Sequence, residues 1–303
     1  MLILEEVARE SRLFFFTEEA RKTKKTLSLQ RKNHSTQRSM KKTLTTLCLC
    51  ALAATMTAQE QELWIDNGTR HIYGILNKCG KDGKRPLVIV AHGFNGTHDY
   101  SKNYFAPLAE EGYHTYAFDF PCGSIYSKSD TNTMNMSVKD QVSDLKAIVT
   151  QLAKRNDVDA SQIVLVGESQ GGLVAALTAA QMPHKIEKLV LVFPALCIPQ
   201  NWRKAYPTLA DIPDTTRLWD VKMGRRYFEE IHDMQTFDEI KHFKRPVIII
   251  QGDKDRIVSM DDSRHALTVY KNAALKVIPG AGHGFNPTEL QKAMEYIKGF
   301  LEE

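Results

Sequence analysis

The chain has 303 residues, of which 43% are hydrophobic and 25% charged, and its formal net charge is +4. The positive charge is concentrated in residues 1–58, which carry 11 Lys or Arg and 5 Asp or Glu, whereas residues 59–303 carry 29 and 31. This balance excludes a basic patch for nucleic acid and a cationic amphipathic helix for a membrane surface. Residues 59–303 are enough for one large domain with a continuous core.

The N-terminal segment resembles a secretory leader. Met40-Lys-Lys42 precedes an apolar stretch, 44–54, and a small residue, Ala58, ends the segment. This stretch is too short for a stable bilayer-spanning helix, so it predicts a signal peptide over 40–58 and no stable membrane anchor. We therefore expect a secreted or periplasmic protein that starts at residue 59. Residues 1–39 are interpreted as a non-native upstream extension, with a disordered basic arm as the alternative.

From residue 63 onward, apolar runs alternate with segments of helical periodicity. The expected strands are a hairpin over 63–76, followed by 86–93, 114–120, 162–166, 188–193, 246–250 and 275–278. The expected helices cover 100–111, 138–155 and 172–180. This alternation predicts an α/β fold whose mostly parallel sheet carries helices on both faces.

One stretch, 198–245, is too long for a simple crossover between strands. It contains several prolines and the aromatic residues Trp202, Tyr206, Trp219, Tyr227 and Phe228. We interpret it as a lid over the carboxyl edge of the sheet. The alternative is a surface subdomain with its own small core, because aromatic side chains are more often packed than left for a ligand.

The pentapeptide Gly167-Glu-Ser-Gln-Gly171 follows an Ile-Val-Leu-Val run and precedes a helix of small residues. A G-x-S-x-G pattern alone also fits an ordinary glycine-rich turn. Its position between strand and helix instead predicts the nucleophile elbow of an α/β-hydrolase, with Ser169 as nucleophile. The small residues let strand and helix approach closely, and the helix N-terminus favours developing negative charge.

A serine hydroxyl needs an imidazole to accept its proton and a carboxylate to orient that imidazole. In this fold the chain order is serine, acid, histidine. Asp255, in Gly252-Asp-Lys-Asp255, is preferred as the acid over Asp253. His283 follows the last expected strand between flanking glycines and is predicted to be the base. The other histidines are expected to be structural or solvated.

An oxyanion hole requires backbone amides that point at the tetrahedral intermediate. The amide of Gln170, directly after the nucleophile, is one predicted donor. Phe94, in His92-Gly-Phe94 after the first long strand, is expected to provide the other, while His92 anchors that loop. Cys79, Cys122 and Cys197 are odd in number and widely spaced, which argues against a disulfide framework or a zinc site. Buried thiols are expected, with one bridge as the alternative.

These motifs together resemble the bacterial cinnamoyl and feruloyl esterases of the α/β-hydrolase superfamily. The resemblance rests on His92-Gly-Phe94, Gly167-Glu-Ser-Gln-Gly-Gly172, Gly252-Asp-Lys-Asp255 and Gly280-Ala-Gly-His283, and it covers nearly all of 63–301. It implies hydrolysis of hydroxycinnamate esters through an acyl-serine, without metal or organic cofactor. It also implies that the lid tyrosine, Tyr227, contacts the aromatic acyl group. Trp219 and Asn201 are further candidates for substrate binding in the lid.

Several positions depart from that family. Glu168 stands where a histidine is frequent, the loop 120–127 differs, and Asn201 replaces an expected acid. The acyl preference is therefore the open point. An acetyl or short-chain carboxylesterase and a serine aminopeptidase remain alternatives, and a non-enzymatic binding protein is disfavoured by the complete serine, acid and histidine set. The expected partner is a small-molecule or oligosaccharide ester; the sequence leaves monomer and homodimer open.

Overall fold

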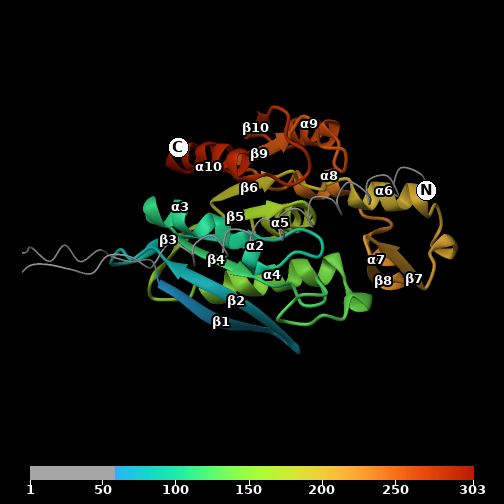
Figure 1. Cartoon of the computed structure of the whole chain (residues 1–303), viewed down its shortest axis with the longest axis horizontal. Coiled ribbons are helices and arrows are strands. Elements are labelled where there is room, and N and C mark those ends of the chain that lie inside the picture. Colours follow the sequence, from blue (N-terminus) through green and yellow to red (C-terminus); the bar gives the residue numbers. More distant parts are fainter. Residues whose placement is uncertain (1–58) are drawn as a thin grey trace, which may run out of the picture. The chain divides into compact units, whose positions relative to one another are not determined.

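A computed structural model of the chain describes residues 59–303, whose centre is an eight-stranded sheet (Figure 1). The strands are β1 (Gln59–Asn67), β2 (Arg70–Lys78), β3 (Arg85–Ala91), β4 (His114–Phe118), β5 (Val158–Glu168), β6 (Lys188–Val192), β9 (Val247–Gly252) and β10 (Ala273–Ile278). Their order is β1-β2-β4-β3-β5-β6-β9-β10. β1 pairs with β2, and β2 with β4, in antiparallel fashion, whereas the pairs from β4 to β10 are parallel. The predicted segments 1–39 and 40–58 lie outside the described residues.

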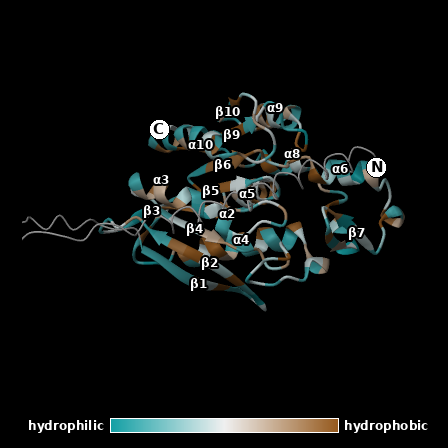
Figure 2. Cartoon of the chain, in the orientation of Figure 1, coloured by the Kyte–Doolittle hydropathy of each residue, from teal (hydrophilic) through white to brown (hydrophobic). Residues whose placement is uncertain are grey.

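The inner strands are apolar on both faces, as expected for a parallel sheet covered by helices. Alternate side chains enter two separate hydrophobic clusters. One face carries Leu87, Ile89, Leu165, Leu189 and Ile249, and the other carries Val88, Val90, Val164, Val166, Val190 and Ile250. Figure 2 shows this concentration of hydrophobic residues along the inner strands and a more hydrophilic β1. The strand predictions are confirmed, with shifts of a few residues at their ends.

The helices cover both faces of the sheet, which confirms the predicted fold class. Residues of α4 (Val138–Leu152), α5 (Gln170–Gln181), α8 (Thr236–Ile240) and α9 (Met260–Val269) pack in the first cluster. Residues from the segment around α3 (Phe105–Glu110) and from α10 (Pro287–Glu302) pack in the second. Ser137 caps α4 by accepting a hydrogen bond from the Asp140 amide at 3.0 Å. This cap explains why that helix begins where it does.

The single helix expected over 100–111 is wrong, because the structure divides this segment into three pieces. These are α2 (His98–Ser101), the 3₁₀ turn η1 (Lys102–Tyr104) and α3. Pro107 lacks an amide hydrogen, and its ring would clash with the carbonyl four residues earlier in a continuous helix. In the observed arrangement Pro107 lies in the first turn of α3, where its missing donor is harmless.

The predicted insertion folds into α6 (Ile198–Ala205), the turn η3 (Leu209–Asp211), the hairpin β7 (Thr215–Leu218) and β8 (Val221–Gly224), and α7 (Arg225–Ile231), followed by α8. Figure 1 shows α6, β7, β8 and α7 together at one end of the sheet. Trp202 stacks on Tyr206 at 5.8 Å between ring centroids and meets Phe228 edge-on at 4.7 Å. Much of its aromatic content therefore forms packing contacts. We keep the name lid for residues 198–245.

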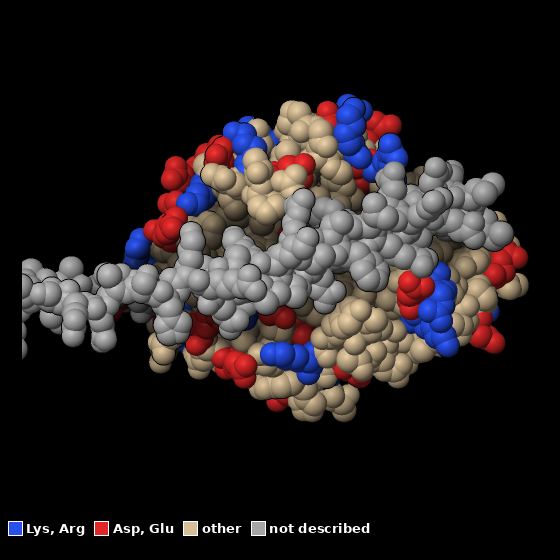
Figure 3. All heavy atoms as spheres, viewed as in Figure 1, with Lys and Arg blue, Asp and Glu red and all other residues tan. Residues whose placement is uncertain are grey.

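Within residues 59–303, no helix is both long and apolar enough to cross a bilayer. The same residues contain no cluster of three or more His, Cys, Asp or Glu arranged to hold a metal ion. Cys79, Cys122 and Cys197 are buried free thiols. On the face drawn in Figure 3, Lys and Arg are interspersed with Asp and Glu over the described surface.

Candidate active site

Ser169 lies on a strained turn between β5 and α5. Its φ of 51° and ψ of −120° fall in a region that non-glycine residues rarely occupy. The turn is close-packed, since a Cβ on Gly167 would lie 2.4 Å from the Gly171 carbonyl oxygen, and one on Gly171 would lie 2.2 Å from the Ala91 oxygen. Only glycine fits at these two positions. This close packing forces the Ser169 side chain out at the carboxyl edge of the sheet.

The structure brings Ser169, His283 and Asp255 into one hydrogen-bonded line. His283 Nε2 lies 2.9 Å from Ser169 Oγ, and His283 Nδ1 lies 2.9 Å from Asp255 Oδ2. The Asp255 side chain is only 1% exposed, whereas that of His283 is 13% exposed. The three residues come from the ends of β5, β9 and β10, which meet at one edge because these strands are parallel. This geometry places a base within reach of the hydroxyl and an acid behind the base.

Two aspartates in the loop after β9 have different partners. Asp255 Oδ1 accepts hydrogen bonds from the amides of Ile257 and Val258, each at 2.9 Å, which leaves Oδ2 for His283. Asp253 instead accepts from the Gly280 amide at 2.7 Å. Of the two aspartates, Asp255 is therefore the one that is hydrogen-bonded to the His283 ring. Asp253 ties the loop that carries His283 to the end of β9, a role that the sequence did not reveal.

The loop after β3 lies directly against Ser169. A Cβ on Gly93 would approach the Ser169 Cβ to 3.0 Å, which shows how near this backbone is. His92 fixes the loop from below: its Nδ1 lies 2.7 Å from the Gly93 oxygen, and its Nε2 accepts from the Phe120 amide at 3.1 Å. Burial lowers the pKa of His92, so the ring stays neutral, as these two opposite roles require. The predicted anchoring contacts of His92 are present.

The two predicted oxyanion donors flank this contact. Among the described residues, the amides of Phe94 and Gln170 have no backbone acceptor of their own. Two hydrogen bonds fix the next residue, Asn95. Its backbone amide donates to the Gly123 oxygen at 3.1 Å, and its side-chain oxygen accepts from the Ile125 amide. These contacts fix the segment next to Phe94, whose neighbour Gly93 approaches Ser169, while Gln170 follows Ser169 as the first residue of α5. Both amides can donate to negative charge that develops beside Ser169.

A buried His–Asp pair supports the same loop from its far end. Asp119 Oδ1 accepts from the His98 amide and contacts His98 Nδ1, both at 2.7 Å, and Oδ2 accepts from the Lys128 amide. These hydrogen bonds lower the pKa of Asp119 against the opposing effect of its burial. The pair lies outside the line of Ser169 and His283. No local pattern signals it, because 21 residues separate its members.

Glu168, the unusual residue of the elbow, contacts Tyr104 of the second hydrophobic cluster. It is 2% exposed and accepts a hydrogen bond from the Tyr104 hydroxyl at 2.6 Å. Burial raises the pKa of Glu168 from its ordinary value of 4.5 to about 7, although the Tyr104 bond favours the charged form. Although Glu168 is next to Ser169 in the sequence, it does not take part in the hydrogen bonds that join Ser169, His283 and Asp255.

The three predicted substrate-binding residues of the lid lie in different settings. Trp219, at the tip of the β7–β8 hairpin with a φ of 47°, meets Phe94 edge-on at 5.8 Å. Its indole nitrogen is buried and has no partner among the described residues. Tyr227 is 2% exposed, and its hydroxyl donates to Gln170 Oε1 at 2.8 Å. Asn201 is exposed on α6. Only Trp219 and Tyr227 contact residues of the candidate site.

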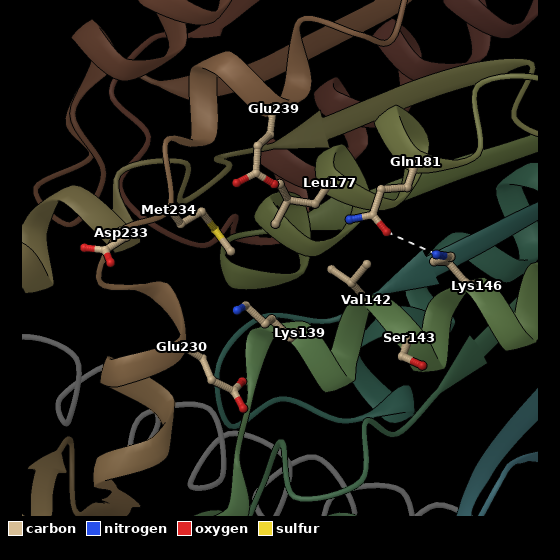
Figure 4. Close-up of a pocket in the computed structure, with 10 residues that line it drawn as sticks. All are labelled: Lys139, Val142, Ser143, Lys146, Leu177, Gln181, Glu230, Asp233, Met234 and Glu239. Carbon is tan, nitrogen blue, oxygen red and sulfur yellow. Dashed lines mark hydrogen bonds between the residues drawn. The ribbon is translucent and has the colours of Figure 1, made fainter.

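A separate cavity of about 500 Å³ lies between the lid and the helices α4 and α5 (Figure 4). Val142, Leu177 and Met234 provide apolar lining, and Lys139 and Glu239 are among the charged residues around them. A second, more polar cavity lies near the β1–β2 turn and includes Arg70 and Cys122. Neither cavity is lined by Ser169, Asp255, His283 or the predicted oxyanion residues.

Comparison with known proteins agrees with this fold. A family model described as serine aminopeptidase, S33, matches residues 82–225. This range includes the elbow and the loop 92–95 after β3, which we call the oxyanion loop because it carries the predicted donor Phe94. The chain therefore has the fold of the α/β-hydrolases. It also resembles the bacterial feruloyl esterases: Est1E from Butyrivibrio proteoclasticus, solved with ferulic acid bound, matches with a TM-score of 0.72 and 27% identity. That match covers 79% of this chain and 97% of the other.

Curated relatives point to the same broad class. The uncharacterised hydrolase YugF of Bacillus subtilis is 24% identical over 262 residues, which cover 73% of this chain and 91% of the relative. The human monoacylglycerol lipase ABHD6 is 26% identical over 175 residues, which cover 57% of this chain and 49% of the relative. These similarities support a hydrolase. They do not identify the substrate, for which the residues of the candidate site provide the argument.

Proposed function

We propose that the protein is a serine carboxylic-ester hydrolase that releases hydroxycinnamates from plant polysaccharide esters. The observation that carries this proposal is the line from Ser169 Oγ through His283 to Asp255, with both hydrogen-bonding distances at 2.9 Å. The similarity to Est1E, a protein solved with ferulic acid, supports the choice of acyl group. Trp219 supports it further, because its ring contacts Phe94 and its buried indole N–H has no hydrogen-bond partner within residues 59–303.

The proposed reaction follows from these positions. Ser169 Oγ attacks the ester carbonyl carbon while His283 Nε2 accepts the hydroxyl proton, and Asp255 stabilises the resulting imidazolium. The amides of Phe94 and Gln170 donate to the oxyanion of the tetrahedral intermediate. As the carbon–oxygen bond to the alcohol breaks, His283 returns the proton to the leaving oxygen. Water then attacks the acyl-serine with the same assistance, which releases the acid and restores Ser169.

Replacement of Ser169 by Ala tests the reaction. We expect turnover of an activated aryl ester to fall by about 10⁶-fold, as when the nucleophile of a serine hydrolase is removed, while the circular dichroism spectrum stays unchanged. Labelling of the wild-type protein by a fluorophosphonate probe should disappear in the same variant. Substantial ester turnover by Ser169→Ala would refute the assignment of the nucleophile.

A second candidate function is peptide hydrolysis at a free amino terminus, which is supported by the match to a family model described as serine aminopeptidase. An acetyl or short-chain carboxylesterase is the third. Rates with methyl ferulate, p-nitrophenyl acetate and an amino-acid arylamide separate the three. We expect methyl ferulate to give the highest kcat/KM. A clear preference for the arylamide would replace the esterase proposal.

Secretion is the remaining part of the proposal, and it rests on the pattern of residues 40–58. N-terminal sequencing of the protein from its natural host should give Gln59 as the first residue. A mature N-terminus upstream of Met40 would contradict both the leader and its proposed start.

A further inference from the structure

A buried chain of hydrogen bonds joins the lid to the residue that follows the nucleophile. The Tyr227 hydroxyl, on α7, donates to Gln170 Oε1 at 2.8 Å, and Gln170 Nε2 donates to Gln141 Oε1 on α4 at 2.9 Å. All three side chains are buried, with exposures of 2–3%. The two bonds occupy opposite ends of one amide group. They therefore fix its orientation as well as its position.

The three hydrogen-bonded side chains carry no charge, and their burial keeps competing water away from them. Burial raises the pKa of Tyr227, so its hydroxyl keeps its proton and remains a donor. In such a buried setting a neutral hydrogen-bond network is stronger than at the surface, and the loss of one member leaves its partner unsatisfied. Gln170 is thus held between two neighbours that belong to different parts of the fold.

The lid helix that carries Tyr227 is itself attached to the body of the domain. Arg226 forms a two-point ion pair with Asp140 of α4, at 2.8 and 3.0 Å. Glu230 of α7 accepts a hydrogen bond from Ser137, the residue that caps α4. Figure 4 shows Glu230 near the start of α4, at the margin of the cavity below the lid. α7 is therefore a fixed support for the Tyr227 hydroxyl.

We propose that Tyr227 is a positioning residue: through the Gln170 side chain it holds the Gln170 amide in place to donate to the oxyanion. This inference rests on the proposed hydrolysis at Ser169 and assigns Tyr227 a different role from recognition of the acyl group. The two roles have different kinetic consequences. A positioning residue affects the transition state for every acyl group, whereas an acyl-binding hydroxyl affects only those acyl groups that it contacts.

The test is Tyr227→Phe, measured with p-nitrophenyl ferulate, cinnamate and acetate, which share one leaving group. We expect kcat to fall about tenfold for all three esters with KM unchanged, because one buried bond is removed and the oxyanion donor is loosened. A loss confined to the ferulate ester, seen as a higher KM, would overturn the inference in favour of acyl binding. Unchanged kinetics with all three would also overturn it.

Two further variants separate positioning from general loss of structure. Tyr206→Phe is the matched control, because its hydroxyl contacts Thr216 within the lid at 3.0 Å. It should keep wild-type kcat. Gln141→Met removes the acceptor on the other side of Gln170 and should reproduce the uniform loss in kcat. The double variant Tyr227→Phe with Gln141→Met should lose less than the product of the two single losses; independent effects would contradict a shared network.

The rate of fluorophosphonate labelling provides a readout that does not depend on the substrate class. Phosphonylation of Ser169 also builds negative charge on an oxygen beside the Gln170 amide, so Tyr227→Phe should slow labelling about tenfold. Slower labelling in a protein that hydrolyses none of the three esters would support the positioning role while refuting the esterase proposal. Normal labelling by Tyr227→Phe would refute the positioning role alone.

Discussion

The strand ends and the lid are stabilised in different ways. Backbone hydrogen bonds and burial fix the residues at the carboxyl ends of β5, β9 and β10, whereas many aromatic side chains of the lid pack against each other. Asp255 receives two amide hydrogen bonds before it meets His283. In the lid, Trp202 packs on Tyr206 and Phe228, while Trp219 alone among the lid tryptophans contacts the oxyanion loop. Under the proposed function, the reaction takes place at the strand ends, and the acyl preference depends on the part of the lid around Trp219.

After the loss of about 10⁶-fold expected for Ser169→Ala, the largest expected effect also tests the strand ends. Asp255→Asn should lower kcat by about 10⁴-fold with little change in stability, because an amide no longer holds His283 in the required tautomer. Steady-state kinetics with an activated ester measure it. Asp253→Asn is the matched control: it changes a neighbouring acid that bonds to the Gly280 amide, and it should retain most of the activity. Equal losses in the two variants would contradict the assignment of Asp255.

A second prediction concerns the buried core beneath the elbow. Because the pKa of Glu168 is raised to about 7 in the folded protein, the folded state keeps a proton that the unfolded chain releases near pH 4.5. Stability should therefore fall as pH rises from about 4.5 to 7, by about 3 kcal/mol for this group. Urea unfolding at pH 5 and pH 8 measures the fall.

Glu168→Gln is the comparison variant, because an amide has nearly the shape of the protonated carboxyl and still accepts from Tyr104. It should unfold with a smaller dependence on pH over that interval. Parallel stability profiles for wild type and variant would show that Glu168 does not carry a perturbed pKa.

The smallest expected effect tests the lid. Trp219→Ala should lower kcat/KM for a ferulate ester about tenfold, because an aromatic acyl group loses one wall of its site, and should leave p-nitrophenyl acetate nearly unchanged. Trp202→Ala should instead lower the melting temperature and preserve the acyl preference, since Trp202 packs within the lid. If Trp202→Ala changes acyl preference as much as Trp219→Ala does, the division within the lid is wrong.

The order of the motifs along the chain was sufficient to predict which residues would meet. In a parallel sheet every strand ends at the same edge, so Ser169, Asp255 and His283, each just beyond a strand, had to lie near one another. The continuous apolar runs likewise predicted the sheet and its two helical layers. The predicted single helix over 100–111 failed because one proline limits where a helix can continue.

What the sequence by itself determined is the α/β-hydrolase fold, the elbow and the residues that meet at it, because local patterns and strand order specify them. Only the tertiary structure decided the side-chain partners of Glu168, Gln170 and Tyr227. Tyr104 lies 64 residues from Glu168, and Tyr227 lies 57 residues from Gln170. Such contacts depend on how helices and lid pack across the sheet, and no local periodicity encodes a hydrogen bond between side chains so distant in the chain.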